Sequence, residues 1–330
     1  MKKSIYINAS GRLSRKDNTI FFESETFGKK FIPVNNVEEI FLFGEIDFNT
    51  KAINFLAQNN ITVHVFNYYG YYSGSFYPRE HLPSGFLLVK QVEKYKDDGE
   101  RLKIAKEIIN GASHNILKNI KYYANRKEGL DEFVERIENE RKNLKGIKTI
   151  NELMGVEGRI RNIYYSAFET IIDGKFVFKN RTMNPPDNPI NALISFGNSM
   201  MYSIVLTEIY NTQLNPTVSY LHEPGERRFS LSLDISEIFK PIIIDRIIFS
   251  LINQKMIREE HFDQDLELCY LNEKGRIIFQ REFEEKLGTV IKHPRLNRSV
   301  SYRRLIRLEC YKIIKHLLDE EEYESLKMWW

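Results

Sequence analysis

Polar and apolar positions alternate along the first 77 residues. The segments SIYINASGRL, NTIFFES, KKFIPV and EEIFLFG each carry β-branched or aromatic residues at spacing two, and Asn, Asp and Gly residues separate them. This period is typical of strands with one buried face, and the separating residues favour turns. The segment NTKAINFLAQNN differs, because its apolar residues have helical spacing behind Asn49 or Thr50 as a cap. We therefore expect one short helix among several short strands.

A hairpin is predicted around residue 70. The strand-like segment ITVHVFN is followed by tyrosine and phenylalanine residues on both sides of Gly70 and Gly74. Glycines between two β-rich segments favour a tight turn, and aromatic residues on paired strands pack against each other. Packing is therefore the expected role of these rings, ahead of base stacking.

The periodicity changes after PREHLPSG, residues 78–85, which contains two prolines and a glycine. We expect this segment to link a small β-rich domain at 1–77 to a larger, mostly α-helical domain at 86–330. Apolar residues recur with a period of 3.6 in the second part. The expected helices cover 101–126, 130–144, 149–172, 189–210, 235–254 and 302–318. The predicted fold class is α+β.

The clearest helical signal begins at Pro189. Asp187 or Asn188 can cap this helix, and proline is well suited to its first turn. A single apolar stripe follows, made of Ile190, Leu193, Ile194, Gly197, Met201, Ile204 and Val205. Such a stripe predicts a helix through the middle of the helical domain.

The composition is that of an ordinary globular protein. Of the 330 residues, 42% are hydrophobic and 28% are charged, and the longest apolar run is interrupted by Asp245 and Arg246. A membrane-spanning helix needs about 20 apolar residues, so no membrane partner is expected. The first residues lack the pattern of a secretory signal, so we expect a cytoplasmic protein. Cys269 and Cys310 stand among apolar neighbours and are expected to be buried.

Candidate chemistry appears in YLHEPGERRFSLSLDISEIFKP, residues 220–241. Asp234 and Glu237 lie three residues apart near the start of a predicted helix and therefore on one face. His222 precedes a turn whose return path leads into the same helix, so its imidazole can come back over the two carboxylates. The alternative is that acidic residues simply favour helix amino termini.

A further carboxylate lies in MGVEGRIRNIYYSAF. Glu157 shares a helical face with Leu153, Ile160 and Tyr164, and that face is expected to be buried. A buried carboxylate is costly unless it has a partner. The partner is either Arg161, one turn later, or a metal ion.

Together, Glu157, His222, Asp234 and Glu237 offer mostly oxygen ligands and a single nitrogen. This mixture suits Mg²⁺ or Mn²⁺ better than zinc. Such an ion activates phosphodiesters, and Arg227, Arg228 and Lys240 nearby supply cations for a phosphodiester chain. His222 is either a metal ligand or a general acid–base, and the pattern leaves that choice open.

A strongly basic segment lies near the carboxyl end. Formal net charge is only +3, but the helix predicted at 302–318 carries Arg303, Arg304, Arg307 and Lys315 on a basic face. A solvated face is the usual meaning of this pattern. The alternative is a groove that follows a DNA backbone.

Several blocks of the sequence resemble, in fixed order, the CRISPR-associated integrase family known as Cas-one. They are the Glu-Gly pair at 157–158, the N-x-x-x-S-F-G run at 191–197, the L-H-E at 221–223 and the S-L-D-x-x-E-x-F-K-P block that follows. The resemblance covers nearly the whole chain. It implies a β-rich amino-terminal domain that mediates homodimerisation and a helical domain that holds a divalent metal.

The family's glutamate, histidine and aspartate ligands match Glu157, His222 and Asp234. Glu237 stands where many members have another aspartate, so its ligation is direct or through water. Tyr202 resembles a family tyrosine, which implies either contact with DNA or core packing. Family members join short DNA fragments (spacers) to the CRISPR repeat by attack of a 3′-hydroxyl on a phosphodiester. They work with dimers of the small Cas-two partner and also cleave branched DNA.

Two alternatives to an integrase remain at this point. One is a nuclease that resolves branched DNA without integration, since water and a 3′-hydroxyl differ only as nucleophiles at the same metal. The other is a DNA-binding scaffold with a decayed site, which the retained Glu, His and Asp disfavour. The CRISPR subtype and the preferred fragment do not follow from the sequence.

Overall fold

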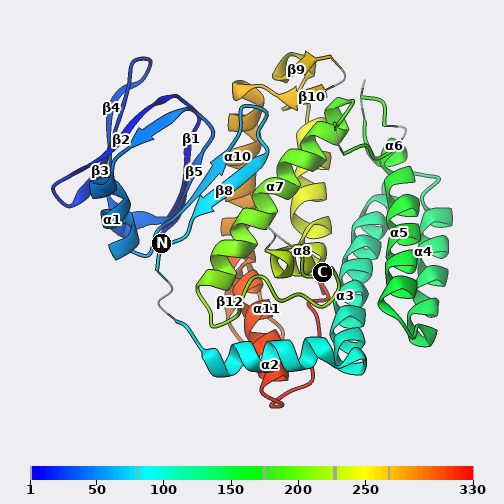
Figure 1. The fold of residues 1–330 in the computed structure, drawn as a ribbon. Helices are drawn as coiled ribbons and strands as arrows, with labels where there is room; N and C mark the ends of the chain where they lie inside the picture. The colour runs from blue at the N-terminus through cyan, green and yellow to red at the C-terminus, as the bar shows by residue number, and fades with distance from the viewer. Residues whose placement is uncertain are drawn as a thin grey trace.

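The computed structural model describes residues 2–79, 82–173, 176–178, 180–183, 185–225, 229–266 and 268–329. Within these residues, two four-stranded sheets build the amino-terminal part of the protein (Figure 1). The first sheet has the order β1 (Lys3–Ile7), β5 (Val37–Leu42), β7 (Thr62–Phe66) and β8 (Tyr72–Phe76). The second has the order β4 (Gly28–Ile32), β3 (Thr19–Ser24), β2 (Gly11–Lys16) and β6 (Ile46–Phe48). Helix α1 (Thr50–Gln58) begins behind Asn49, whose side chain accepts a hydrogen bond from the Ala52 amide.

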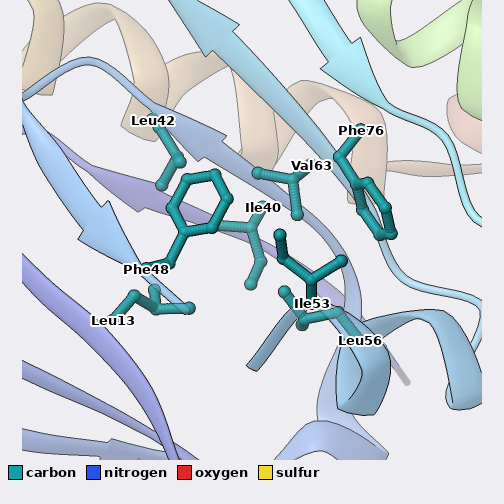
Figure 2. A pocket seen from close by; sticks show the side chains of 8 residues that line it. All are labelled: Leu13, Ile40, Leu42, Phe48, Ile53, Leu56, Val63 and Phe76. Carbon is teal, nitrogen blue, oxygen red and sulfur yellow. The ribbon is translucent and has the colours of Figure 1, made fainter. Parts of the chain in front are cut away.

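The first sheet carries buried apolar side chains on both faces, because alternate residues of its strands point to opposite sides. Ile40 and Leu42 join the core between the two sheets and α1, whereas Phe41 and Phe43 join the core of the helical part. Figure 2 shows the apolar side chains that meet between the sheets and α1. The space they leave is about 10 Å³. It is a packing gap of at most one water molecule and not a ligand site.

The helical part surrounds α7 (Pro189–Tyr210). The other helices are α2 (Gly85–Lys96), α3 (Asp98–Ala124), α4 (Asp131–Asn143), α5 (Ile150–Ser166), α6 (Phe168–Ile171), α8 (Ser230–Phe239), α9 (Arg246–Asn253), α10 (Glu273–Gly288) and α11 (Tyr302–Leu317). Two small hairpins complete it: β9 (Phe262–Asp265) with β10 (Leu268–Leu271), and β11 (Val290–Lys292) with β12 (Ser299–Ser301). Within the described residues, α7 alone is long and apolar enough to cross a membrane. However, 78% of its most apolar stretch is buried, as in a core helix.

The structure confirms the α+β class and most of the predicted elements. The hairpin between β7 and β8 turns at Asn67 to Tyr71 with Gly70 at φ +83°, and both cysteines are buried. The single helix expected at 235–254 is wrong. It begins earlier, at Ser230, and Pro241–Asp245 forms a π-helical segment between α8 and α9. Pro241 lacks an amide hydrogen, and the Asp245 amide donates to the Lys240 carbonyl five residues back.

Buried ion pairs join the first sheet to the helices. The Arg303 guanidinium lies 3.0 Å from Glu39 Oε1 and 3.7 Å from Glu208 Oε1, and it donates to Ser4 Oγ at 2.6 Å. Arg307 contacts Glu208 Oε2 at 2.5 Å and Glu38 Oε1 at 3.2 Å. Glu39 and Glu208 are fully buried, so their charges depend on these arginines. Charges of β5, α7 and α11 thus form one cluster, which we call the interdomain ion cluster.

This cluster corrects one expectation. Arg303 and Arg307 were predicted on a basic, DNA-facing surface, but their guanidinium groups face inward onto carboxylates of β5 and α7. A run of cations at helical spacing does not reveal which of them meet buried acids from distant elements. Arg304, between them, forms no ion pair within the described residues, and its predicted contact with DNA stays a prediction.

His64 sits beside the interdomain ion cluster. Its ring is fully buried and hydrogen-bonds to Ser75 Oγ at 2.6 Å and Thr207 Oγ1 at 2.9 Å. Burial, together with the charge of Arg303, lowers the pKa of His64 from 6.5 to about 3. The native protein therefore keeps this ring neutral where the unfolded chain protonates it.

The interdomain ion cluster predicts a large effect of Arg303→Ala. The substitution leaves Glu39 and Glu208 with less compensation in a buried site, so we expect the free energy of unfolding to fall by about 3–5 kcal/mol. Arg304→Ala, one residue away and without an ion pair, should change it by less than about 0.5 kcal/mol. Urea denaturation of both variants measures this difference. Equal effects would contradict the role given to Arg303.

Because of His64, we expect the free energy of unfolding to fall in acid. Because its pKa is lower in the folded state, its stabilising contribution is complete above pH 6.5 and is lost as pH falls toward about 3. The expected loss is about 1.4 kcal/mol per pH unit well below pH 6.5. Urea denaturation between pH 7 and pH 4 should show a shallower pH dependence for His64→Asn than for the natural protein. Parallel curves would refute this account of His64.

Candidate active site

Asp234 lies at the centre of the candidate site, on the first turns of α8. The side chain has no solvent exposure. Its Oδ2 atom accepts from the amides of Tyr220 (2.7 Å) and Leu221 (2.9 Å), and its Oδ1 atom accepts from the His222 amide (3.0 Å) and His222 Nδ1 (2.8 Å). Three consecutive amides and one imidazole therefore compensate one buried carboxylate.

Hydrogen bonds in the segment before α8 hold the three amides in position around Asp234. Ser230 Oγ donates to the Thr217 carbonyl at 2.9 Å, and the Leu231 amide donates to the Pro216 carbonyl at 3.0 Å. Ser219 Oγ then donates to the His222 carbonyl at 2.7 Å. These bonds hold residues 216–222 against the start of α8, so the amides of this segment point at Asp234.

The contact with Asp234 fixes the tautomer of His222. Asp234 already accepts three amide hydrogens as a carboxylate, so Nδ1 of the imidazole must carry the hydrogen that it donates. The Nε2 atom then keeps its lone pair. Within the described residues Nε2 makes no hydrogen bond, and 27% of the side chain is exposed. His222 can therefore bind a metal ion or accept a proton at Nε2.

Glu157 and Glu237 meet at one guanidinium group. Arg161, on α5, forms an ion pair with Glu157 of the same helix and another with Glu237 of α8. Lys240 Nζ lies 2.7 Å from Glu237 Oε1 and 2.7 Å from Tyr202 Oη of α7. Side chains from three helices thus converge next to Asp234, which lies one turn before Glu237 on α8.

Charges in this cluster shift pKa values in opposite directions. Burial lowers the pKa of Arg161, whereas the neighbouring Glu157 carboxylate raises it. The second effect prevails, so the net shift is upward and the guanidinium stays charged. Burial alone raises the pKa of Tyr202, but Lys240 and Arg161 lower it, with a net downward shift. Burial raises the pKa of Asp245 to about 6, although a hydrogen bond with Tyr164 and the charge of Arg161 oppose the shift.

Hard oxygen donors dominate this set, and its chemistry fits Mg²⁺ or Mn²⁺. Within the described residues, however, no three His, Cys, Asp or Glu side chains converge closely enough to surround an ion as they stand. Arg161 occupies the place between Glu157 and Glu237, and Asp234 has all its lone pairs in use. Binding at Glu157 would require the Arg161 side chain to move away from it.

The structure brings together six of the predicted site residues. Glu157, Glu237, Lys240 and Tyr202 form one cluster with Arg161, and His222 lies on Asp234. Lys240 is buried and bonded within the site, which does not fit the predicted contact with DNA. Arg227 and Arg228 lie outside the described residues.

Sequence reasoning missed the bridging role of Arg161, which it treated only as a partner of Glu157. It also missed Asp245, whose carboxylate is buried among the isoleucines of PIIIDRII and bonded to Tyr164 of α5. The signal was present, because a single acid inside an apolar run needs a partner. Its partner lies some eighty positions earlier in the chain, where no local pattern points to it.

Comparison with known proteins identifies close relatives. Residues 5–285 match the family model of the CRISPR associated protein Cas1. A protein of Thermodesulfovibrio yellowstonii called CRISPR-associated endonuclease Cas1 3 is 53% identical over 99% of this chain and 100% of its own length. A CRISPR-associated endonuclease Cas1 of Fusobacterium nucleatum is 52% identical over 100% of this chain and 98% of its own length.

Solved structures share the fold. A Cas1 protein from Thermotoga maritima superposes with a TM-score of 0.88 at 42% sequence identity, over 98% of this chain and 99% of that one. A casposase bound to an integration product has a TM-score of 0.88 at 20% identity, over 100% of this chain and 95% of that one. The second likeness speaks for the fold alone.

Proposed function

The chain belongs to the CRISPR-associated Cas1 family, and we propose that it is a divalent-metal-dependent DNA endonuclease and integrase of CRISPR adaptation. In this proposal it joins short DNA fragments to the CRISPR repeat by attack of a 3′-hydroxyl on a repeat phosphodiester. Relatives that are more than half identical over their full length are called CRISPR-associated endonucleases. The observation that carries the proposal is the pairing of His222 with Asp234 beside the Glu157–Arg161–Glu237 cluster.

In the proposed site, Glu157, Glu237 and His222 through Nε2 are the residues that would hold Mg²⁺ or Mn²⁺, either directly or through water. Asp234, which was predicted as a ligand, has both carboxylate oxygens engaged in hydrogen bonds and positions His222. When bound, such an ion would supply Lewis-acid polarisation of a phosphate oxygen and stabilisation of the leaving oxygen. Asp234 keeps the imidazole in one tautomer and orientation, as partners of metal-bound histidines commonly do. Lys240 donates a hydrogen bond to Glu237 and another to Tyr202, so the two residues together position the Glu237 carboxylate.

The nucleophile determines whether the proposed site carries out strand transfer or cleavage. A 3′-hydroxyl gives strand transfer and water gives cleavage, while the same residues serve both. Arg161 has a separate part in this proposal. It offsets the repulsion between Glu157 and Glu237 before the ion binds, and its guanidinium is then free for a phosphate oxygen.

The proposed partners are double-stranded DNA and the small Cas-two protein. Arg227, Arg228 and Arg304 remain the candidates for contact with the DNA backbone. Of these, Arg304 lies on α11 and forms no ion pair within the described residues. Arg303 and Arg307 were predicted in the same role, but their guanidinium groups already pair with carboxylates in the interdomain ion cluster.

We further propose that the chain forms a homodimer through the second sheet. Phe27, just before β4, and Phe31, in β4, are 69% and 54% exposed, and the Phe31 ring packs at a tilt against the Phe21 ring with centroids 5.0 Å apart. Lys16 extends its ammonium group toward both rings, 5.6 Å from each centroid. Large exposed aromatic side chains on a sheet mark a contact surface for another protein.

Strand transfer tests the proposed function. A duplex with 3′-hydroxyl ends, repeat DNA, Mn²⁺ and the Cas-two partner should give a joined product, and a 3′-blocked duplex should give none. Glu157→Gln and His222→Gln should each lower the rate at least about 100-fold, because each removes a metal ligand or proton acceptor. Glu152→Gln, an exposed acid on the same helix as Glu157, serves as control and should stay within about twofold of the natural protein.

Other products would identify the alternatives. Metal-dependent cleavage of branched DNA, with no joining of a 3′-hydroxyl duplex, would mean a nuclease without integrase activity. DNA binding that persists in a chelator, with no metal-dependent product under any condition, would mean a scaffold.

Sedimentation velocity tests the homodimer. The natural chain should sediment as a dimer at micromolar concentration, and Phe27→Ser with Phe31→Ser should shift it to monomer without a change in melting temperature. Leu266→Ser removes an apolar residue far along the chain that is even more exposed, at 93%, and should leave the dimer intact. A monomeric natural protein, or an equal effect of Leu266→Ser, would count against this surface.

A further inference from the structure

Two side chains at the corner between α2 and α3 contact the segment that carries His222. Tyr95 lies in the last turn of α2, and Arg101 lies in the first turn of α3. Asp97 separates the two helices, and its Oδ1 atom accepts a hydrogen bond from the Glu100 amide at 2.9 Å. The guanidinium carbon of Arg101 lies 4.6 Å from the centre of the Tyr95 ring, so the ring and the cation orient each other.

Arg101 binds the segment at two points. Its Nε atom donates to the Tyr220 carbonyl at 3.0 Å, and its Nη2 atom donates to Glu223 Oε1 at 2.7 Å. The other carboxylate oxygen of Glu223, Oε2, accepts from the Tyr95 hydroxyl at 2.9 Å. The corner between α2 and α3 therefore holds both oxygens of this carboxylate.

His222 lies between these two points of the chain. The amides of Tyr220 and His222 donate to Asp234, which is fully buried. The Tyr220 carbonyl and the Glu223 carboxylate instead bind Arg101. An anion thus binds the amides of the segment and a cation binds its carbonyl. With residues fixed before and after it, the His222 backbone has little freedom to turn Nε2 away.

A surface ion pair by itself contributes little to stability. The contact of Arg101 differs, because only 11% of its side chain is exposed and the guanidinium also donates to a main-chain carbonyl. Lys103, two residues later on α3, provides the contrast. Its side chain is 46% exposed and forms ion pairs with Glu322 and Glu100. These two acids lie outside the segment of His222.

We propose that Arg101 is a positioning residue for His222, which it holds in place through the Tyr220 carbonyl and the Glu223 carboxylate. Partners that orient a functional histidine typically change activity about 10- to 100-fold. Arg101 acts through the backbone, one step further from the ring, so we expect the lower end of this range. The inference rests on the proposed function for the reaction that His222 serves, but not for the anchoring of the segment.

Amide hydrogen exchange of the metal-free protein, followed by NMR, tests the anchoring. Arg101→Gln should speed exchange at residues 220–222 at least about tenfold, because the segment opens more often without its second contact. Amides in the middle of α7 should exchange as in the natural protein, which shows that the fold is intact. Lys103→Gln is the matched control and should leave residues 220–222 unchanged. Tyr95→Phe removes only the hydroxyl on Glu223 and should have a smaller effect in the same direction.

Strand transfer tests whether the anchoring matters for the reaction. At saturating DNA, Arg101→Gln should lower the rate about tenfold. DNA affinity in a chelator should stay within about twofold of the natural value, because the positioning of His222 serves the reaction and not DNA binding. A merely structural role would lower the rate and the DNA-binding capacity together, since both follow the fraction of folded protein.

Unchanged exchange at residues 220–222 in Arg101→Gln would overturn the proposal. Faster exchange with the same rate as Lys103→Gln would also overturn it, because the segment would then be held without consequence for His222. If the natural protein joins no DNA, the proposed function fails, whereas the exchange measurement still decides whether Arg101 anchors the segment.

Discussion

The candidate site depends on the compensation of one buried carboxylate. Asp234 carries its charge inside the protein, where an unpaired charge is too costly to persist. Its partners are the amides of Tyr220, Leu221 and His222, so the chain before α8 has little freedom to take another path. The orientation of the imidazole follows from this constraint, and with it the position of the free nitrogen. Chemistry and local folding are thus set by the same four hydrogen bonds.

Compensation of buried carboxylates also joins the amino-terminal sheets to the helical part of the protein. Glu39 and Glu208 are buried where the first sheet meets α7 and α11, and they hold Arg303 and Arg307 inward. Phe41, Phe43 and Phe66 from the sheet enter the helical core at the same interface. The sheet is therefore a wall of the helical core on one face and of its own core on the other. Its placement relative to α7, which carries Tyr202, follows from both contacts.

Local sequence patterns predicted the features that are determined by neighbouring residues in the chain. The period of two predicted the strands, and the cap at Asn188 with Pro189 predicted where α7 begins. The pairing of His222 with Asp234 was also within reach, because a short loop separates the two residues. Local patterns could not predict three other features: the π-helical segment, the ion pair of Arg161 with Glu237 and the inward direction of the Arg303 side chain. Each depends on a partner from another element, and the identity of that partner is decided by packing.

The central claim is that Glu157 and His222, the latter held by Asp234, bind one divalent ion. Electron paramagnetic resonance of Mn²⁺ bound to protein with ¹⁵N-labelled histidine tests it most directly. The account predicts one tightly bound ion per chain, with a ¹⁵N coupling that disappears in His222→Gln and an affinity that falls at least about tenfold in Glu157→Gln. Unchanged Mn²⁺ affinity in both variants, or the absence of any ¹⁵N coupling in the natural protein, would contradict it.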